Sequence, residues 1–107
     1  MAEHPGVVFR DGPTGRRAGL VTGPDVWEVV RAVRSARTAK PDLEEEPLLT
    51  LVAGNAGIPL RMIHTAVRYW ATYPTEIDAE IDMAAVAEQT VEQAWARERD
   101  LLRRRDP

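Results

Sequence analysis

The sequence contains no cysteine, and this absence excludes both a disulfide framework and a metal site built on thiolates. It also lacks a long apolar run. We therefore expect no transmembrane helix and no secretory signal, and we predict a cytoplasmic protein without a membrane partner. With 107 residues, the chain has the length of one small domain. Because such a domain buries a limited share of its surface, we expect a second subunit to belong to the stable unit.

Residues suited to catalysis or metal binding are scarce as well. The two histidines, His4 and His64, lie sixty positions apart, and neither belongs to a cluster of metal ligands. The glycine-rich segment 12–15 lacks the lysine and hydroxyl order of a phosphate-binding loop. Carboxylates alternate over residues 76–82, so on a helix they spread around the surface instead of converging. We predict that the protein is not an enzyme and has no catalytic residue, metal or cofactor.

The charge is unevenly distributed along the chain. The net charge of −3 is unusual for a nucleic-acid-binding protein, which is commonly basic. Residues 1–40 carry seven basic and four acidic side chains, residues 41–73 carry two and four, and residues 74–107 carry five and nine. An ordinary solvated surface explains this asymmetry as well as a binding surface does. The basic side chains of the first part are Arg10, Arg16, Arg17, Arg31, Arg34, Arg37 and Lys40.

Two short β-prone runs near the N-terminus predict a hairpin. Residues 7–10 and 16–21 flank a turn at residues 12–15. Because an isolated hairpin is only marginally stable in water, it should pack on the helices or pair with the hairpin of a second subunit. The first helix is expected to open at residues 23–25, with Pro24 in its first position.

Residues 49–68 have the spacing of a helix-turn-helix. The small Ala53 precedes Gly57 by four positions, and Ile63 follows six positions later. Two steeply crossed helices need a small residue where their backbones approach, a glycine that adopts a positive φ in the turn, and an apolar wedge on the second helix. We expect the first helix at residues 47–55 and the second from Ile58 onward. The second helix of such a unit is placed to enter the major groove of DNA.

The second helix of this unit has two faces. Leu60, Ile63 and Val67 are expected to point inward. The opposite face then carries the predicted DNA-contacting residues, which are Arg61, His64, Thr65 and Arg68. Arg16 and Arg17 of the hairpin are expected to hold DNA phosphates. The alternative is that all of these side chains form only the solvated surface of the protein.

The pattern after residue 75 predicts a long last helix. Thr75 is its expected cap, and residues 76–104 carry a heptad-like seam that Glu88 and Glu98 interrupt. Such a helix reaches about 40 Å, so its distal half should protrude or meet another chain. Aromatic and aliphatic side chains on a protruding helix commonly anchor a protein partner. The predicted partner-binding residues are Val91, Trp95, Leu101 and Leu102.

Four segments carry a resemblance to a known family: residues 10–18 (RDGPTGRRA), 23–27 (GPDVW), 66–70 (AVRYW) and 76–78 (EID). The chain resembles, over residues 7–82, small bacterial helix-turn-helix proteins of the VapB-like antitoxin type, which belong to a widespread family of unknown function. Such proteins are often encoded beside a nuclease-like toxin. The resemblance implies a dimeric DNA-binding antitoxin that represses its own operon and holds the toxin with its C-terminal segment.

The sequence as a whole predicts a mainly α (α+β) protein. We expect a β-hairpin over residues 1–22, a helix and a helix-turn-helix over residues 23–82, and a C-terminal partner-binding helix over residues 83–107. The predicted function is that of a DNA-binding antitoxin or transcriptional regulator of a toxin–antitoxin pair. Its expected partners are double-stranded DNA, a cognate toxin and a second copy of the chain. The alternative is a protein-interaction adaptor that has a helix-turn-helix shape but does not bind DNA.

Overall fold

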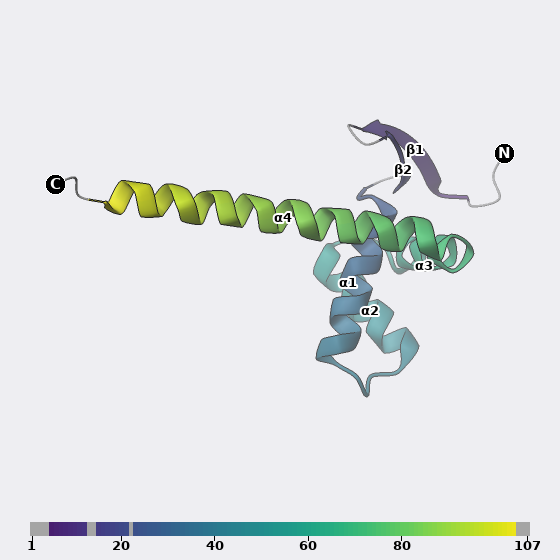
Figure 1. Ribbon diagram of the computed structural model, residues 1–107. Coiled ribbons are helices and arrows are strands. Elements are labelled where there is room, and N and C mark those ends of the chain that lie inside the picture. Colours follow the sequence, from purple (N-terminus) through teal and green to yellow (C-terminus); the bar gives the residue numbers. More distant parts are fainter. Residues whose placement is uncertain (1–4, 13–14, 22, 105–107) are drawn as a thin grey trace.

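The elements follow one another as the sequence predicts. The computed structural model describes residues 5–12, 15–21 and 23–104. Strands β1 (Val7–Gly12) and β2 (Gly15–Leu20) form an antiparallel hairpin (Figure 1). Four helices follow, α1 (Val26–Ala39), α2 (Glu45–Ala56), α3 (Leu60–Thr72) and α4 (Pro74–Arg103). The expected mainly helical fold, with an N-terminal hairpin and a long C-terminal helix, is therefore confirmed.

Helix α1 is the centre of the domain. It contacts β2 and each of the other three helices. Its buried face is made of four valines, Val26, Val29, Val30 and Val33. Because β-branched residues have modest helix propensity, this helix is held mainly by burial of that face. Its N-terminus is fixed by Asp25, whose backbone N–H donates a hydrogen bond of 2.9 Å to Glu28 Oε1.

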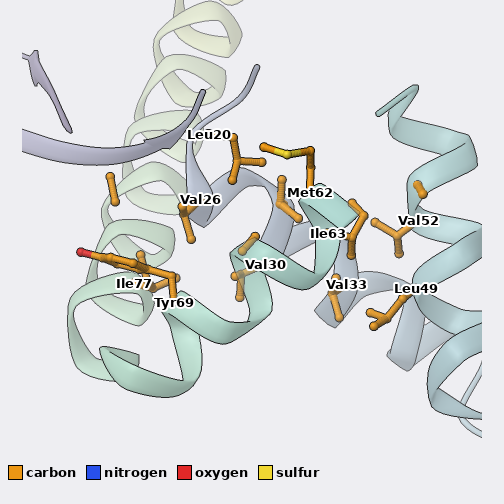
Figure 2. Packing of buried hydrophobic residues seen from close by; sticks show 14 of the residues in the cluster. Leu20, Val26, Val30, Val33, Leu49, Val52, Met62, Ile63, Tyr69 and Ile77 are labelled. Atoms are coloured by element: carbon orange, nitrogen blue, oxygen red, sulfur yellow. The ribbon is translucent and has the colours of Figure 1, made fainter. Parts of the chain in front are cut away.

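The hydrophobic core joins all four helices to the second strand (Figure 2). Its largest fully buried side chains are Leu20, Val26, Val30, Ile63 and Ile77. Leu20 comes from β2, so the hairpin contributes to the same core as the helices. Of the two arrangements expected for the hairpin, the structure therefore has the one in which it packs on helices of its own chain.

Several helix ends differ from the expected ones. Pro24 lies before the cap Asp25 and is not the first residue of α1. Helix α2 begins at Glu45, two residues earlier than expected, so Pro47 lies inside its first turn. Proline is tolerated there because the first N–H groups of a helix have no intrahelical acceptor. For the same reason α4 begins at Pro74, and the expected cap at Thr75 is wrong.

A left-handed glycine makes the corner between α2 and α3. Gly57 has φ 70° and ψ 30°, and its N–H donates a hydrogen bond of 2.9 Å to the carbonyl oxygen of Ala53. The corner predicted at this position is confirmed. The buried face of α3 differs in part from the expected one, because Met62, Ile63, Ala66 and Tyr69 are buried. Two residues expected to point inward, Leu60 and Val67, are only partly buried at the edge of the core.

We expect Gly57→Ala to lower the free energy of unfolding by about 1–2 kcal/mol, because an L side chain is strained at a positive φ. No atom lies within 4 Å of a Cβ built at this position, so the cost is backbone strain and not a clash. Gly54 is the matched control because it is equally open but lies inside α2. Gly54→Ala should raise the stability by about 0.5–1 kcal/mol. Urea unfolding of both variants measures the difference, and equal effects would contradict a left-handed corner.

The last helix leaves the rest of the molecule. Ile77 and Ile81 of α4 are buried, whereas every residue from Ala85 to Arg104 is exposed. The distal half of α4 extends well beyond the other elements (Figure 1). At 30 residues the helix is about 45 Å long, and the molecule measures 63 Å in its longest direction. Among the described residues, no helix combines the length and apolar character that crossing a membrane requires.

Candidate functional site

Two arginines stand on the outer face of α3, directly after the Gly57 corner. Arg61 and Arg68 are both exposed. They lie seven residues apart, which places them on the same side of the helix with a separation of about 10 Å along its axis. Within residues 5–12, 15–21 and 23–104, neither guanidinium forms an ion pair. Both guanidinium groups are therefore available to one extended anionic ligand that runs along the helix, such as the backbone and base edges of a DNA groove.

The other two predicted contacts on α3 have partners within the chain. His64 Nε2 lies 2.8 Å from Glu46 Oε1, so this side chain connects α3 to the first turn of α2. The hydroxyl of Thr65 donates a hydrogen bond of 2.9 Å to the carbonyl oxygen of Arg61. Its methyl group faces Gly6, where an added Cβ would lie 3.4 Å away. To touch DNA, His64 and Thr65 would have to exchange these contacts for new ones.

Arg16 of the hairpin is exposed and lies near α3. Its guanidinium stacks 4.5 Å above the centre of the Phe9 ring. The Phe9 ring in turn lies edge-on to the ring of Tyr69 on α3, with 6.3 Å between the ring centres. Stacking on an aromatic face leaves the N–H groups of an arginine free to donate outward. Arg16 is thus a third basic group beside α3 that can meet a phosphate.

Arg17 has a role that the sequence did not indicate. It forms an ion pair with Asp25, with 3.3 Å between Nη1 and Oδ2. Arg10 approaches the other carboxylate oxygen at 3.2 Å and donates to the carbonyl oxygen of Leu20 at 2.7 Å. Asp25 is buried, and these two guanidinium groups offset the loss of hydration that burial of a carboxylate causes. Arg17 therefore stabilises the junction between the hairpin and α1, and we leave it out of the candidate DNA surface.

The sequence does contain a signal that Arg16 and Arg17 have different roles, namely the alternation of side chains along a strand. Neighbouring strand residues point to opposite faces, so Arg16 and Arg17 cannot serve the same ligand from a flat hairpin. The register pairs Arg17 with Arg10, which places both on one face. Gly19 lies on that face too. A Cβ there would come within 2.5 Å of Arg10 Nη1, so the glycine leaves the space through which Arg10 reaches Asp25.

A partly buried carboxylate lies close to this ion-pair cluster. Burial, together with the neighbouring charges of Glu76 and Asp25, raises the pKa of Glu80, and Arg17 opposes this effect. Within the part of the chain that the structure describes, Glu80 Oε1 and Arg17 Nε are buried and form no hydrogen bond. Tyr69 donates a hydrogen bond of 3.0 Å to Glu76 Oε2, and burial with this contact raises the pKa of the phenol. The cluster thus holds an excess of acidic groups at the base of α4.

We expect Glu80→Gln to raise the melting temperature at pH 7. Because the pKa of Glu80 is raised in the folded chain, the folded state binds the proton more tightly than the unfolded state. The charge therefore costs stability as the pH rises from the ordinary glutamate range through the raised pKa. Below about pH 4 both states are protonated, and the variant should match the wild type. Melting curves from about pH 3 to about pH 8 test both parts of this prediction, with the exposed Asp42→Asn as the control. A lower melting temperature at pH 7 would contradict it.

A cavity of about 400 Å³ lies between α1, α2 and α3. Its lining is mostly apolar, and Trp70 is the largest side chain in it. The basic groups at its edge have partners. Arg37 donates to three carbonyl oxygens of the connection to α2, and Arg34 lies 3.7 Å from Asp78. In the described part of the chain, no group of three His, Cys, Asp or Glu side chains is placed to hold a metal ion.

The predicted partner-binding residues of α4 are open to solvent. Val91 and Trp95 are 47% and 60% exposed, and Leu101 and Leu102 are 63% and 79% exposed. A shallow groove of about 350 Å³ lies on this helix and is lined by Ala87, Glu88, Val91, Glu92 and Trp95. Exposed apolar side chains of this size, grouped on one segment, are typical of a surface that another protein covers.

The structure therefore divides the predicted site residues into two groups. Arg61 and Arg68 on α3 and Arg16 on the neighbouring hairpin are exposed. His64, Thr65 and Arg17 instead have partners within the chain. Comparison of the chain with protein-family models, with curated proteins and with solved structures gives no match. A proposal for the function therefore depends on the arrangement of the exposed arginines and of the exposed apolar residues of α4.

Proposed function

We propose that the protein is a helix-turn-helix DNA-binding regulator of the antitoxin type, with α3 as the helix that reads the major groove. The single observation that carries this proposal is the exposed pair Arg61 and Arg68, which has no ion-pair partner among the described residues and follows a left-handed glycine corner. A second helix placed in this way after a tight turn is the recognition element of helix-turn-helix proteins.

The chemistry of the exposed face suits DNA. An arginine donates two parallel hydrogen bonds to guanine O6 and N7, or binds a phosphate. Arg16, held on the Phe9 ring, adds a phosphate contact from the hairpin. The net charge of −3 does not oppose this, because the C-terminal third of the chain holds most of the excess acid. With about three basic contacts, the attraction to DNA is modest and local.

The distal half of α4 is the proposed binding surface for a protein partner, the cognate toxin in an antitoxin system. Val91, Trp95, Leu101 and Leu102 are exposed there, and aromatic side chains carry much of the binding energy of protein interfaces. The resemblance to VapB-like antitoxins favours this division of labour between a DNA-binding core and a partner-binding tail. In this proposal the protein acts in the bacterial cytoplasm, where its operon lies.

The direct test is a titration of the full chain onto a fluorescent duplex from the region upstream of its own gene. We expect binding that weakens steadily from about 50 to about 300 mM salt, with a log–log slope of about −2 to −3 for two or three phosphate contacts. A shuffled duplex of equal composition should bind more weakly. If the chain binds neither duplex at the lowest salt, DNA binding is wrong and the adaptor hypothesis, with α4 as its binding surface, is favoured.

A further inference from the structure

The exposed half of α4 carries charges that are sorted along its length. Up to Trp95, every charged side chain of the helix is acidic, and the exposed ones nearest the tip are Glu88 and Glu92. Beyond Trp95 the balance is basic. Between Trp95 and the last described residue, Arg104, arginines occupy positions 97, 99, 103 and 104, and acids occupy positions 98 and 100. A helix that is acidic on one side of an apolar centre and basic on the other is complementary to itself when reversed.

The apolar residues of this half form one seam. Val91, Trp95, Glu98 and Leu102 follow one another at steps of four, three and four residues, which keeps them on one face of a helix. Glu92 and Arg99 flank the seam on one side, one position after Val91 and Glu98. Ala94 and Leu101 flank it on the other side, one position before Trp95 and Leu102. One flank thus carries a negative and a positive charge, and the other flank carries a small and a large side chain.

We propose that this seam pairs with the same seam of a second copy, in antiparallel orientation. In the register that places Val91 opposite Leu102 of the second copy, Glu92 lies beside Arg99 of that copy. Twofold symmetry repeats both contacts. Ala94 then leaves room for the larger Leu101. Trp95 shares a layer with Glu98 of the second copy, where its indole N–H has a carboxylate to donate to.

The charges exclude the parallel orientation. Parallel pairing places Glu98 opposite Glu98 within the seam, where like charges are least screened. Glu88, the preceding acid of the seam, already has a partner in its own chain, because its Oε2 lies 2.9 Å from Arg31 Nη1 of α1. It also aligns the acidic half with the acidic half and the basic half with the basic half. The antiparallel register instead places the acidic part of each helix beside the basic part of the other, with Glu92 beside Arg99 of the second copy. A polar residue within the seam, Glu98, fixes the register as buried polar residues do in coiled coils.

This inference rests on one part of the proposed function, that the distal half of α4 is a protein-binding surface. It names the second copy as the occupant when no other partner is bound. It is independent of DNA binding, because α3 lies at the other end of the helix. In this register the two copies of Ile77 are about 58 Å apart at 1.5 Å per residue, so pairing leaves both recognition helices uncovered.

The test is sedimentation velocity of the full chain without DNA, from about 5 to about 200 μM, with three charge variants. The wild type should pass from monomer to dimer over this range. Glu92→Arg and Arg99→Glu each turn two attractive contacts into two repulsive ones, so each should raise the dissociation constant about tenfold at low salt. The double variant restores opposite charges across the interface and should return the dissociation constant to near the wild-type value.

Unfolding of α4 in the variants cannot explain a weaker dimer in the single reversals and a restored dimer in the double variant. Each single reversal replaces a like-charge pair four residues apart, Glu88 with Glu92 or Arg99 with Arg103, by an attractive one, so α4 itself should be strengthened. Circular dichroism provides that control. The inference is overturned if the wild type stays monomeric at the highest concentration, if neither single reversal weakens the dimer, or if the double variant stays as weak as the single ones. DNA titrations of the same variants report separately on α3.

Discussion

Ile63→Ala is expected to lower the free energy of unfolding by about 2–5 kcal/mol, a far larger loss than truncation of any exposed side chain should cause. Ile63 is completely buried, and its side chain lies among residues of α1 and α2 in the core (Figure 2). Removing three carbons leaves a cavity that rigid helix packing closes only in part. Because domains are stable by about 5–15 kcal/mol in total, the variant should be close to unfolding at physiological temperature.

The measurement is urea unfolding followed by circular dichroism. Two further variants bracket the effect. Ile63→Val removes one carbon and should cost about 0.5–1.5 kcal/mol. Leu102→Ala removes an aliphatic side chain that is 79% exposed, so it should change the stability by no more than about 0.5 kcal/mol. If Ile63→Ala and Leu102→Ala were equally stable, α3 would not be anchored by Ile63, and the orientation of its outer face would be in doubt.

The second large effect concerns DNA. In the double variant Arg61→Ala/Arg68→Ala, we expect the affinity for the upstream duplex to fall at least tenfold, since each base or phosphate contact of an arginine contributes about 1–3 kcal/mol. The log–log salt slope should decrease by up to about 2, because two phosphate contacts at most are lost. Both side chains are exposed, so the fold should be preserved. Fluorescence anisotropy at several salt concentrations measures both quantities.

Arg97→Ala/Arg103→Ala is the matched control, because it removes the same charge from exposed positions on α4. These two arginines lie away from the apolar seam of α4 and far along the helix from α3. The control should bind the duplex nearly as well as the wild type. Equal losses in the two double variants would show that binding follows the total charge of the chain and not the surface of α3.

The corner at Gly57 could be predicted from the sequence because its causes are local. A glycine that follows a small residue by four positions, between two apolar runs, leaves few other conformations for a tight turn. The length of α4 could be predicted for a similar reason, since no glycine or proline occurs after Pro74 up to Arg103. Helix ends were predicted less well, because prolines in a first turn fit several starting positions.

The ion pairs could not be predicted, because they join elements that are distant in sequence. Asp25 looks like an ordinary helix cap until the hairpin brings Arg10 and Arg17 to it. His64 looks like a free surface group until Glu46 of α2 lies beside it. Such contacts depend on how the elements pack, and no spacing in the sequence records the packing. They decide which of the predicted DNA contacts are available.

Whether α3 meets DNA is tested by titrating the isotope-labelled chain with the upstream duplex and recording the NMR signals of its backbone amides. We predict that the largest shifts come from α3 around Arg61 and Arg68, with smaller ones near Arg16. The amide signals of the distal half of α4 should not shift. If the duplex instead shifted the signals of α4 and left those of α3 unchanged, DNA would bind another surface and α3 would not be the recognition helix.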